Sequence, residues 1–65
     1  MNLIVNGDPR VVLDGCTVAL LIENLQINAQ GVAVAVDGSV LPRSQWDARL
    51  TENATVEVLA AVQGG

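Results

Sequence analysis

Two hydrophobic periods run along this chain, and together they predict several strands and one helix. The apolar stretch at residues 2–6 predicts a first strand, and the turn signal Asn6-Gly7-Asp8-Pro9 follows it. Residues 10–13 predict the return strand of a hairpin. Because Pro9 has no N–H to donate to a neighbouring strand, we expect the return strand at the edge of the sheet.

A helical period replaces the strand period after Asp14-Gly15. Thr17 is a typical N-cap residue, because its hydroxyl can accept a hydrogen bond from a backbone N–H of the first turn. Apolar residues then recur at the spacing i, i+3, i+4 and i+7, which is one helical face: Val18, Leu21, Ile22 and Leu25. We expect the helix to end between residues 25 and 28.

The second half of the chain returns to strand patterns. Residues 32–36 alternate Val and Ala, so both faces are apolar and an interior strand with a helix over one side is expected. Asp37-Gly38 predicts a turn, residues 40–41 a brief strand, and residues 42–50 a turn of helix anchored by Trp46. Residues 55–62 predict the last strand, with alternate residues on one side: Val56, Val58, Ala60 and Val62.

This order of elements predicts an α+β fold in which a mixed sheet of four to five strands wraps one helix, a β-grasp arrangement. We expect a single domain over residues 1–62 and a flexible tail over residues 63–65. A chain of 65 residues buries only about 60% of the surface that its unfolded form exposes, so the core must be small. Trp46 is the only aromatic residue and is expected to pack there, although a surface Trp46 could also contact a partner.

Charge and cysteine content exclude several classes of protein. Seven acidic residues and three arginines give a net charge of −4, which disfavours binding to nucleic acids or to anionic membranes. A single cysteine cannot form an intramolecular disulfide, and the first residues lack the pattern of a signal peptide, so a cytoplasmic protein is expected.

Most catalytic constellations are excluded as well. The chain has no histidine, so neither a Ser-His nor a Cys-His pair can form, and no zinc site is expected. The glycines do not form a phosphate-binding loop pattern such as GxGxxG or GxxxxGK. Cys16 precedes the predicted helix, where a thiolate would be stabilised, but a buried structural thiol is the favoured interpretation. We therefore do not expect an enzyme, and we expect no cofactor bound by this chain.

The end of the chain offers a different chemistry. Gln63, Gly64 and Gly65 follow the last predicted strand, and three extended residues reach roughly 10 Å. Glycine tolerates almost any backbone conformation, so such a tail can thread a narrow channel and present the Gly65 carboxylate to a partner enzyme. Adenylation by ATP would turn that carboxylate into an electrophile. The alternative is that the terminal glycines are merely unconstrained. The absence of lysine is compatible with an activated acyl group, though it is not diagnostic.

Several segments together resemble the ThiS family of thiamine-biosynthesis sulfur carriers. The resemblance covers the whole chain, and its two most specific pieces are the segment Val40-Leu41-Pro42-Arg43-Ser44-Gln45-Trp46 and the terminal Gly64-Gly65. Further similar segments are Leu3-Ile4-Val5-Asn6-Gly7, Thr17-Val18-Ala19-Leu20-Leu21, Val34-Ala35-Val36-Asp37-Gly38 and Val56-Glu57-Val58-Leu59. One departure is Glu52-Asn53, where the family often has Asp-Gly.

This resemblance implies a ubiquitin-like β-grasp fold and a defined set of partners. An E1-like adenylyltransferase, ThiF, would activate the Gly65 carboxylate with ATP and Mg²⁺, neither of which this chain would hold. Sulfur from a cysteine desulfurase system would then give a Gly65 thiocarboxylate, which thiazole synthase, ThiG, would consume. Alternatives are the small sulfur-carrying subunit of molybdopterin synthase, a ubiquitin-like protein modifier, and a passive β-grasp interaction module. We expect a monomer when the protein is free.

Overall fold

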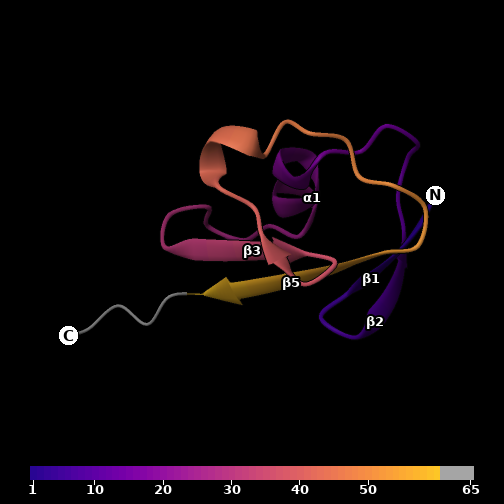
Figure 1. Cartoon of the computed structure of the whole chain (residues 1–65), viewed down its shortest axis with the longest axis horizontal. Helices are drawn as coiled ribbons and strands as arrows, with labels where there is room; N and C mark the ends of the chain where they lie inside the picture. The colour runs from indigo at the N-terminus through magenta and orange to yellow at the C-terminus, as the bar shows by residue number, and fades with distance from the viewer. Residues whose placement is uncertain (61–65) are drawn as a thin grey trace.

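The computed structural model describes residues 1–60, which form a five-stranded mixed sheet with one helix on one face (Figure 1). The order of strands across the sheet is β2-β1-β5-β3-β4. β5 (Ala54–Ala60) lies at the centre, parallel to β1 (Asn2–Val5) and antiparallel to β3 (Val32–Val36). The fold class and the strand count expected from the sequence are confirmed. The boundary predicted between residues 62 and 63 lies outside the described residues.

The first hairpin differs from the prediction in where its second strand begins. β2 covers Asp8–Val11 and not residues 10–13, although it does lie at the edge of the sheet as expected. Asn6 and Gly7 alone make the turn, because both adopt positive φ angles of 51° and 83°. Pairing therefore resumes at once with Val5 opposite Asp8, and Pro9 is tolerated within an edge strand.

Helix α1 spans Val18–Asn24 and begins where the sequence predicts. The Thr17 hydroxyl accepts a hydrogen bond from the Leu20 N–H at 3.2 Å. Another N–H of the first turn, that of Ala19, donates to the carbonyl oxygen of Trp46 at 3.0 Å, so a distant segment also caps the helix. The helix ends at Asn24, one residue before the predicted range of 25–28, because Gln26 has a φ of 59°, which cannot continue a right-handed helix.

The second half of the chain follows the predicted order with shorter elements. β3 has the predicted bounds, and it lies inside the sheet between β5 and β4. β4 is Ser39–Val40, one residue earlier than predicted, because the Asp37-Gly38 turn also needs only two residues of positive φ. The helical turn expected within residues 42–50 is a single 3₁₀ turn, η1, at Arg43–Gln45. β5 begins at Ala54 and its described part ends at Ala60, whereas the prediction of 55–62 extends to Val62, outside the described residues.

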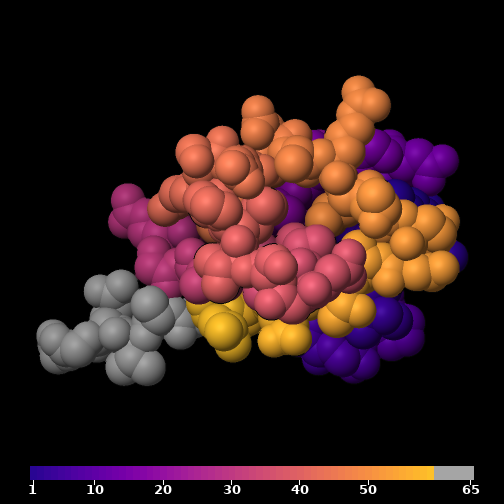
Figure 2. Space-filling view, in the orientation of Figure 1, coloured from indigo at the N-terminus to yellow at the C-terminus, as the bar shows by residue number. Residues whose placement is uncertain are grey.

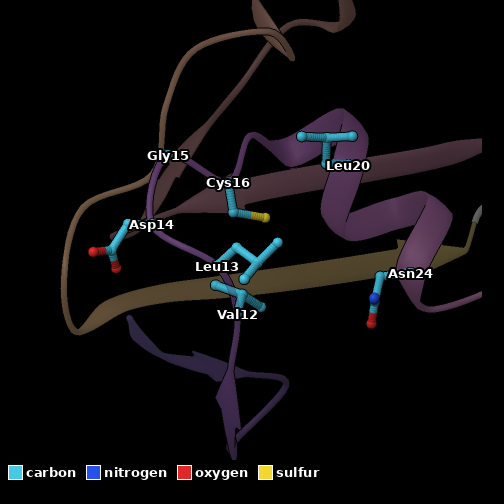
Figure 3. A pocket seen from close by; sticks show the side chains of 7 residues that line it. All are labelled: Val12, Leu13, Asp14, Gly15, Cys16, Leu20 and Asn24. Atoms are coloured by element: carbon cyan, nitrogen blue, oxygen red, sulfur yellow. The ribbon is translucent and has the colours of Figure 1, made fainter.

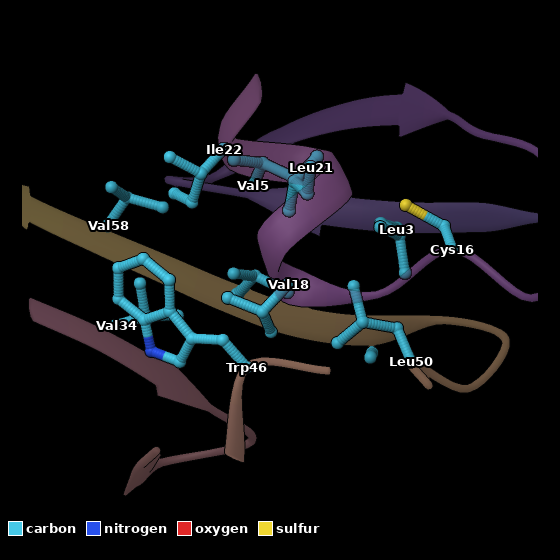
Figure 4. Close-up of a cluster of buried hydrophobic side chains, with 12 residues drawn as sticks. Leu3, Val5, Cys16, Val18, Leu21, Ile22, Val34, Trp46, Leu50 and Val58 are labelled. Carbon is cyan, nitrogen blue, oxygen red and sulfur yellow. The ribbon is translucent and has the colours of Figure 1, made fainter. Parts of the chain in front are cut away.

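The hydrophobic core lies between α1 and the inner face of the sheet (Figure 4). The helix contributes Val18, Leu21 and Ile22, as its apolar period predicts. The sheet contributes alternate residues of three neighbouring strands: Leu3, Val5, Val34, Ala54, Val56 and Val58. Trp46 and Leu50 close the core from the side of the segment that follows β4. Burial of apolar surface at about 25 cal/mol per Å² thus holds the sheet against a helix of only two turns.

No helix in the described residues is long and apolar enough to cross a membrane.

Candidate functional site

β5 is the element that leads the chain toward its predicted reactive residues. Gln63, Gly64 and Gly65, which the sequence analysis singles out, lie outside the described residues 1–60. The structure describes the strand that precedes them in the chain. β5 pairs with β1 from Leu3 opposite Ala54 to Val5 opposite Val56, and with β3 from Val36 opposite Val56 to Val32 opposite Ala60. The described residues therefore end on the central strand of the sheet, at Ala60.

Alternate residues of β5 serve two different surfaces. Val56 and Val58 are buried against the helix, with exposed fractions of 0% and 8%. Thr55, Glu57 and Leu59 point to the opposite face and are exposed. This two-residue period is what the sequence predicts for a strand with one covered face. The exposed face of β5 is therefore available to a partner right up to the end of the strand.

Four apolar residues lie on that open face of the sheet, across β5, β3 and β4, beside the exposed Glu57 that lies opposite Ala35. We define the outer patch by four residues: Ala33, Ala35, Val40 and Leu59. They share one face because Leu59 lies opposite Ala33, and Val40 lies opposite Ala35. Val40 is 74% exposed and Leu59 is 61% exposed, so both aliphatic side chains are open to contact by a partner. The space-filling view shows β5 side chains at the surface on the side of the sheet away from α1 (Figure 2).

Two turn residues hold β5 through their side chains. The Asn6 side chain accepts a hydrogen bond from the Val58 N–H at 2.8 Å and donates to the Val58 carbonyl oxygen at 3.3 Å. On the other side of β5, the Asp37 carboxylate accepts from the Thr55 N–H at 2.9 Å. In the sequence, Asn6-Gly7 and Asp37-Gly38 predict only turns. Nothing in the sequence relates Asn6 to a residue 52 positions away, so these contacts were missed.

Cys16 is a buried residue, which supports the structural interpretation of this thiol. Its side chain is 8% exposed, and its sulfur lies 3.4 Å from the carbonyl oxygen of Thr17. Burial raises the pKa of the Cys16 thiol, the opposite of the shift that activates a nucleophilic cysteine. Among the described residues, no group of three or more Cys, Asp or Glu side chains is arranged to hold a metal ion.

Trp46 also has a packing role. It is 7% exposed, and its indole N–H donates to the carbonyl oxygen of Leu41 at 3.2 Å. The Arg43 guanidinium lies over the ring, 5.1 Å from its centroid. The ring thus anchors the segment after β4 to the core and is not a surface anchor for a partner.

A shallow cleft of about 280 Å³ lies between helix α1 and the loop that precedes it (Figure 3). Leu13 and Leu20 border it, and the Cys16 sulfur points into the space between them. The loop that borders the cleft follows β2, and the Val12 N–H donates a hydrogen bond to the Met1 carbonyl oxygen at 2.9 Å. The neighbouring Asn2 carbonyl oxygen accepts from the Asn53 N–H, just before β5 begins, so the loop lies near the start of β5 and not near Ala60. The cleft is therefore separate from the outer patch.

Together, the mixed sheet, the single helix and the central last strand define a small ubiquitin-like β-grasp protein. Comparison with known families agrees: the model of the ThiS family matches residues 3–65. The chain belongs to the ThiS family, as the resemblance implied. Among solved structures, it is similar to the thiamine biosynthesis protein ThiS from Geobacter metallireducens, with a TM-score of 0.85 and 36% sequence identity over 100% of both chains. No curated protein sequence matches it.

Proposed function

We propose that this chain is a sulfur carrier for thiamine biosynthesis whose reactive group is the carboxylate of Gly65. The observation that carries the proposal is the extent of the family match, which runs through residue 65 and so includes Gly64-Gly65. The similar structure from Geobacter metallireducens is itself a thiamine biosynthesis protein. The exposed face of β5 supports the proposal, because it leaves a surface for a partner beside the strand that leads to Gly65.

The chemistry begins with a carboxylate that is unreactive toward nucleophiles. Attack of the Gly65 carboxylate on the α-phosphorus of ATP releases pyrophosphate and forms an acyl adenylate. A persulfide then attacks the acyl carbon and displaces AMP, which leaves an acyl disulfide. A thiol attacks the sulfur of the donor and forms a disulfide with it, which breaks the S–S bond of the acyl disulfide and releases the Gly65 thiocarboxylate. The sulfur is now nucleophilic yet covalently tethered, so it can be delivered without being released.

The partners follow from these steps. An E1-like adenylyltransferase, ThiF, would bind ATP and Mg²⁺ and catalyse the first step. A cysteine desulfurase system would supply the persulfide, and thiazole synthase, ThiG, would accept the sulfur. In this scheme the chain is a substrate of its partners and not an enzyme. Gln63 and Gly64 would occupy the channel of the partner so that Gly65 reaches the reacting atoms.

The outer patch is the surface that we assign to the adenylyltransferase. A partner that binds Gly65 must approach the end of β5, and Leu59 lies on that strand one residue before Ala60. Burial of an exposed leucine or valine side chain contributes about 1.5–3 kcal/mol, so Leu59 and Val40 can supply much of a docking free energy. A rigid docking surface fixed to β5 would place the reactive end of the chain in the active site.

Deletion of Gly65 tests the proposal directly. We expect the truncated chain to fold with unchanged stability, because the hydrophobic core is formed by residues within 1–60. We expect ATP–pyrophosphate exchange by the adenylyltransferase to be lost, and growth without thiamine to fail in a strain that lacks its own carrier. The matched control is a Val11→Ala variant, which keeps Gly65 and changes an exposed side chain on β2. Complementation by the truncated chain would show that the proposal is wrong.

An intact mass measured on protein from thiamine-starved cells tests the thiocarboxylate itself. Replacement of one oxygen by sulfur changes the mass almost as much as one oxidation does, so Met1 or Cys16 oxidation would mimic it. The modification must therefore be localised by fragmentation to Gly65. The same measurement after incubation with ThiG or with the large subunit of molybdopterin synthase identifies the acceptor, because only the true acceptor removes the sulfur.

A further inference from the structure

Asn6 is joined to the last strand by a bidentate contact that turn formation does not require. A type I′ turn needs positive φ at Asn6 and Gly7, and glycine satisfies this at either position. The Asn6 side chain does more, because its amide accepts from the N–H of Val58 and donates to the carbonyl oxygen of Val58. The turn of the β1–β2 hairpin thereby lies against β5 (Figure 1).

This contact extends the pairing of β5 beyond the end of β1. The backbone of β1 pairs with β5 only as far as Val5 opposite Val56, and the Asn6 N–H then bonds to the carbonyl oxygen of Val56 at 2.9 Å. The Asn6 side chain takes the place of the next peptide group and holds Val58, two residues nearer to Ala60. On this side of β5, Asn6 is thus the last observed support in the described residues before the strand reaches Ala60.

We propose that Asn6 is a positioning residue that fixes the direction in which β5 delivers the reactive end of the chain to the adenylyltransferase. The identity of the partner enzyme rests on the proposed function. The positioning role itself rests on the hydrogen bonds between Asn6 and Val58. The Asn6 side chain holds β5 on one side and β3 pairs with it on the other, so the end of β5 keeps a fixed direction. A misplacement of about 1 Å at a reacting atom can lower a rate a hundredfold, so a small pivot matters.

Asp37 provides a matched control within the same chain. It has a positive φ of 49°, is followed by a glycine, and accepts a hydrogen bond from β5 through its side chain. Its contact is at Thr55, the second residue of β5, and so lies far along the strand from Ala60. Asn6→Gly and Asp37→Gly each keep the turn; the first removes two side-chain hydrogen bonds to Val58 and the second removes one to Thr55. Only the first substitution removes contacts near the end of the strand.

The experiment compares kinetics of ATP–pyrophosphate exchange by the cognate adenylyltransferase with each purified variant as substrate. For Asn6→Gly we expect kcat to fall about tenfold or more while KM changes much less, because every side chain of the outer patch is retained. Asp37→Gly should retain both constants. Asn6→Asp keeps an acceptor for the Val58 N–H but cannot donate to the Val58 carbonyl oxygen, so it should be intermediate. Urea unfolding of all variants separates these effects from global stability.

A second measurement does not depend on the partner. Backbone ¹⁵N relaxation should show reduced order at the Leu59 and Ala60 amides in Asn6→Gly and unchanged order there in Asp37→Gly. Equal kcat losses in the two glycine variants, or unchanged order at Leu59 and Ala60 in Asn6→Gly, would overturn the positioning role. A wild-type chain that is not adenylated refutes the proposed function instead, and the relaxation data then still decide whether Asn6 holds the end of β5.

Discussion

Val58 and Leu59 are neighbours on β5 with opposite environments, so truncation of each should have opposite consequences. Val58 is 8% exposed and belongs to the core, whereas Leu59 is 61% exposed on the outer patch. We predict that Val58→Ala lowers stability with little direct effect on docking. We predict that Leu59→Ala weakens docking to the adenylyltransferase and leaves stability nearly unchanged.

The magnitudes follow from burial. Val58→Ala removes the equivalent of two methylene groups, about 1.6 kcal/mol in transfer free energy, and the cavity left behind raises the cost to about 2–3 kcal/mol. For a chain of 65 residues the total stability is only about 3–10 kcal/mol, so the melting temperature should fall by about 10–20 °C. Leu59→Ala changes a side chain that is already largely hydrated and should cost about 0.5 kcal/mol or less. If the partner buries it, the loss of about 1.4 kcal/mol raises KM about tenfold.

Thermal unfolding and ATP–pyrophosphate exchange measure the two effects on the same samples. Val11→Ala is the control for exposure alone, because Val11 is 77% exposed on β2, at the far edge of the same face, and should change neither quantity. A wild-type KM for both Leu59→Ala and Val11→Ala would show that the outer patch does not bind the adenylyltransferase. A melting temperature of Val58→Ala within a few degrees of the wild-type value would show that Val58 contributes little to the core.

Two further predictions concern Trp46 and Cys16. Trp46→Phe keeps an aromatic ring in the core but leaves the Leu41 carbonyl oxygen without its indole donor. Urea unfolding should therefore show that the free energy of unfolding falls by about 1–2 kcal/mol. An unchanged free energy would mean that this hydrogen bond contributes nothing to stability. Because burial raises the pKa of Cys16, the unfolded chain ionises first, and stability should fall as the pH rises above about 8.5; a Cys16→Ala variant should lack this alkaline loss. The native thiol should also react with a thiol reagent far more slowly than the urea-unfolded chain does, and equal rates would contradict its burial.

Local chemistry explains why so much of the fold could be predicted. Thr17 caps α1, and Val18, Leu21 and Ile22 are buried, because an N-cap and a 3.6-residue period depend on neighbours within a turn or two. The turns at Asn6-Gly7 and Asp37-Gly38 form where expected, because few residue pairs tolerate successive positive φ angles. The strand boundaries shifted for the same reason, since a two-residue turn lets pairing resume sooner than a longer one.

Tertiary structure alone decided which face of each strand a partner can reach and what holds the last strand. The alternation of β5 separates Val58 from Leu59, but only the single helix on one side of the sheet determines that Leu59 is the exposed one. The contacts of Asn6 with Val58 and of Trp46 with Ala19 join residues that are far apart in sequence, and no local pattern encodes such distances. Conversely, the chemical case for Gly65 came from the sequence, because the reactivity of a terminal carboxylate depends on its covalent structure and not on side chains that folding brings together.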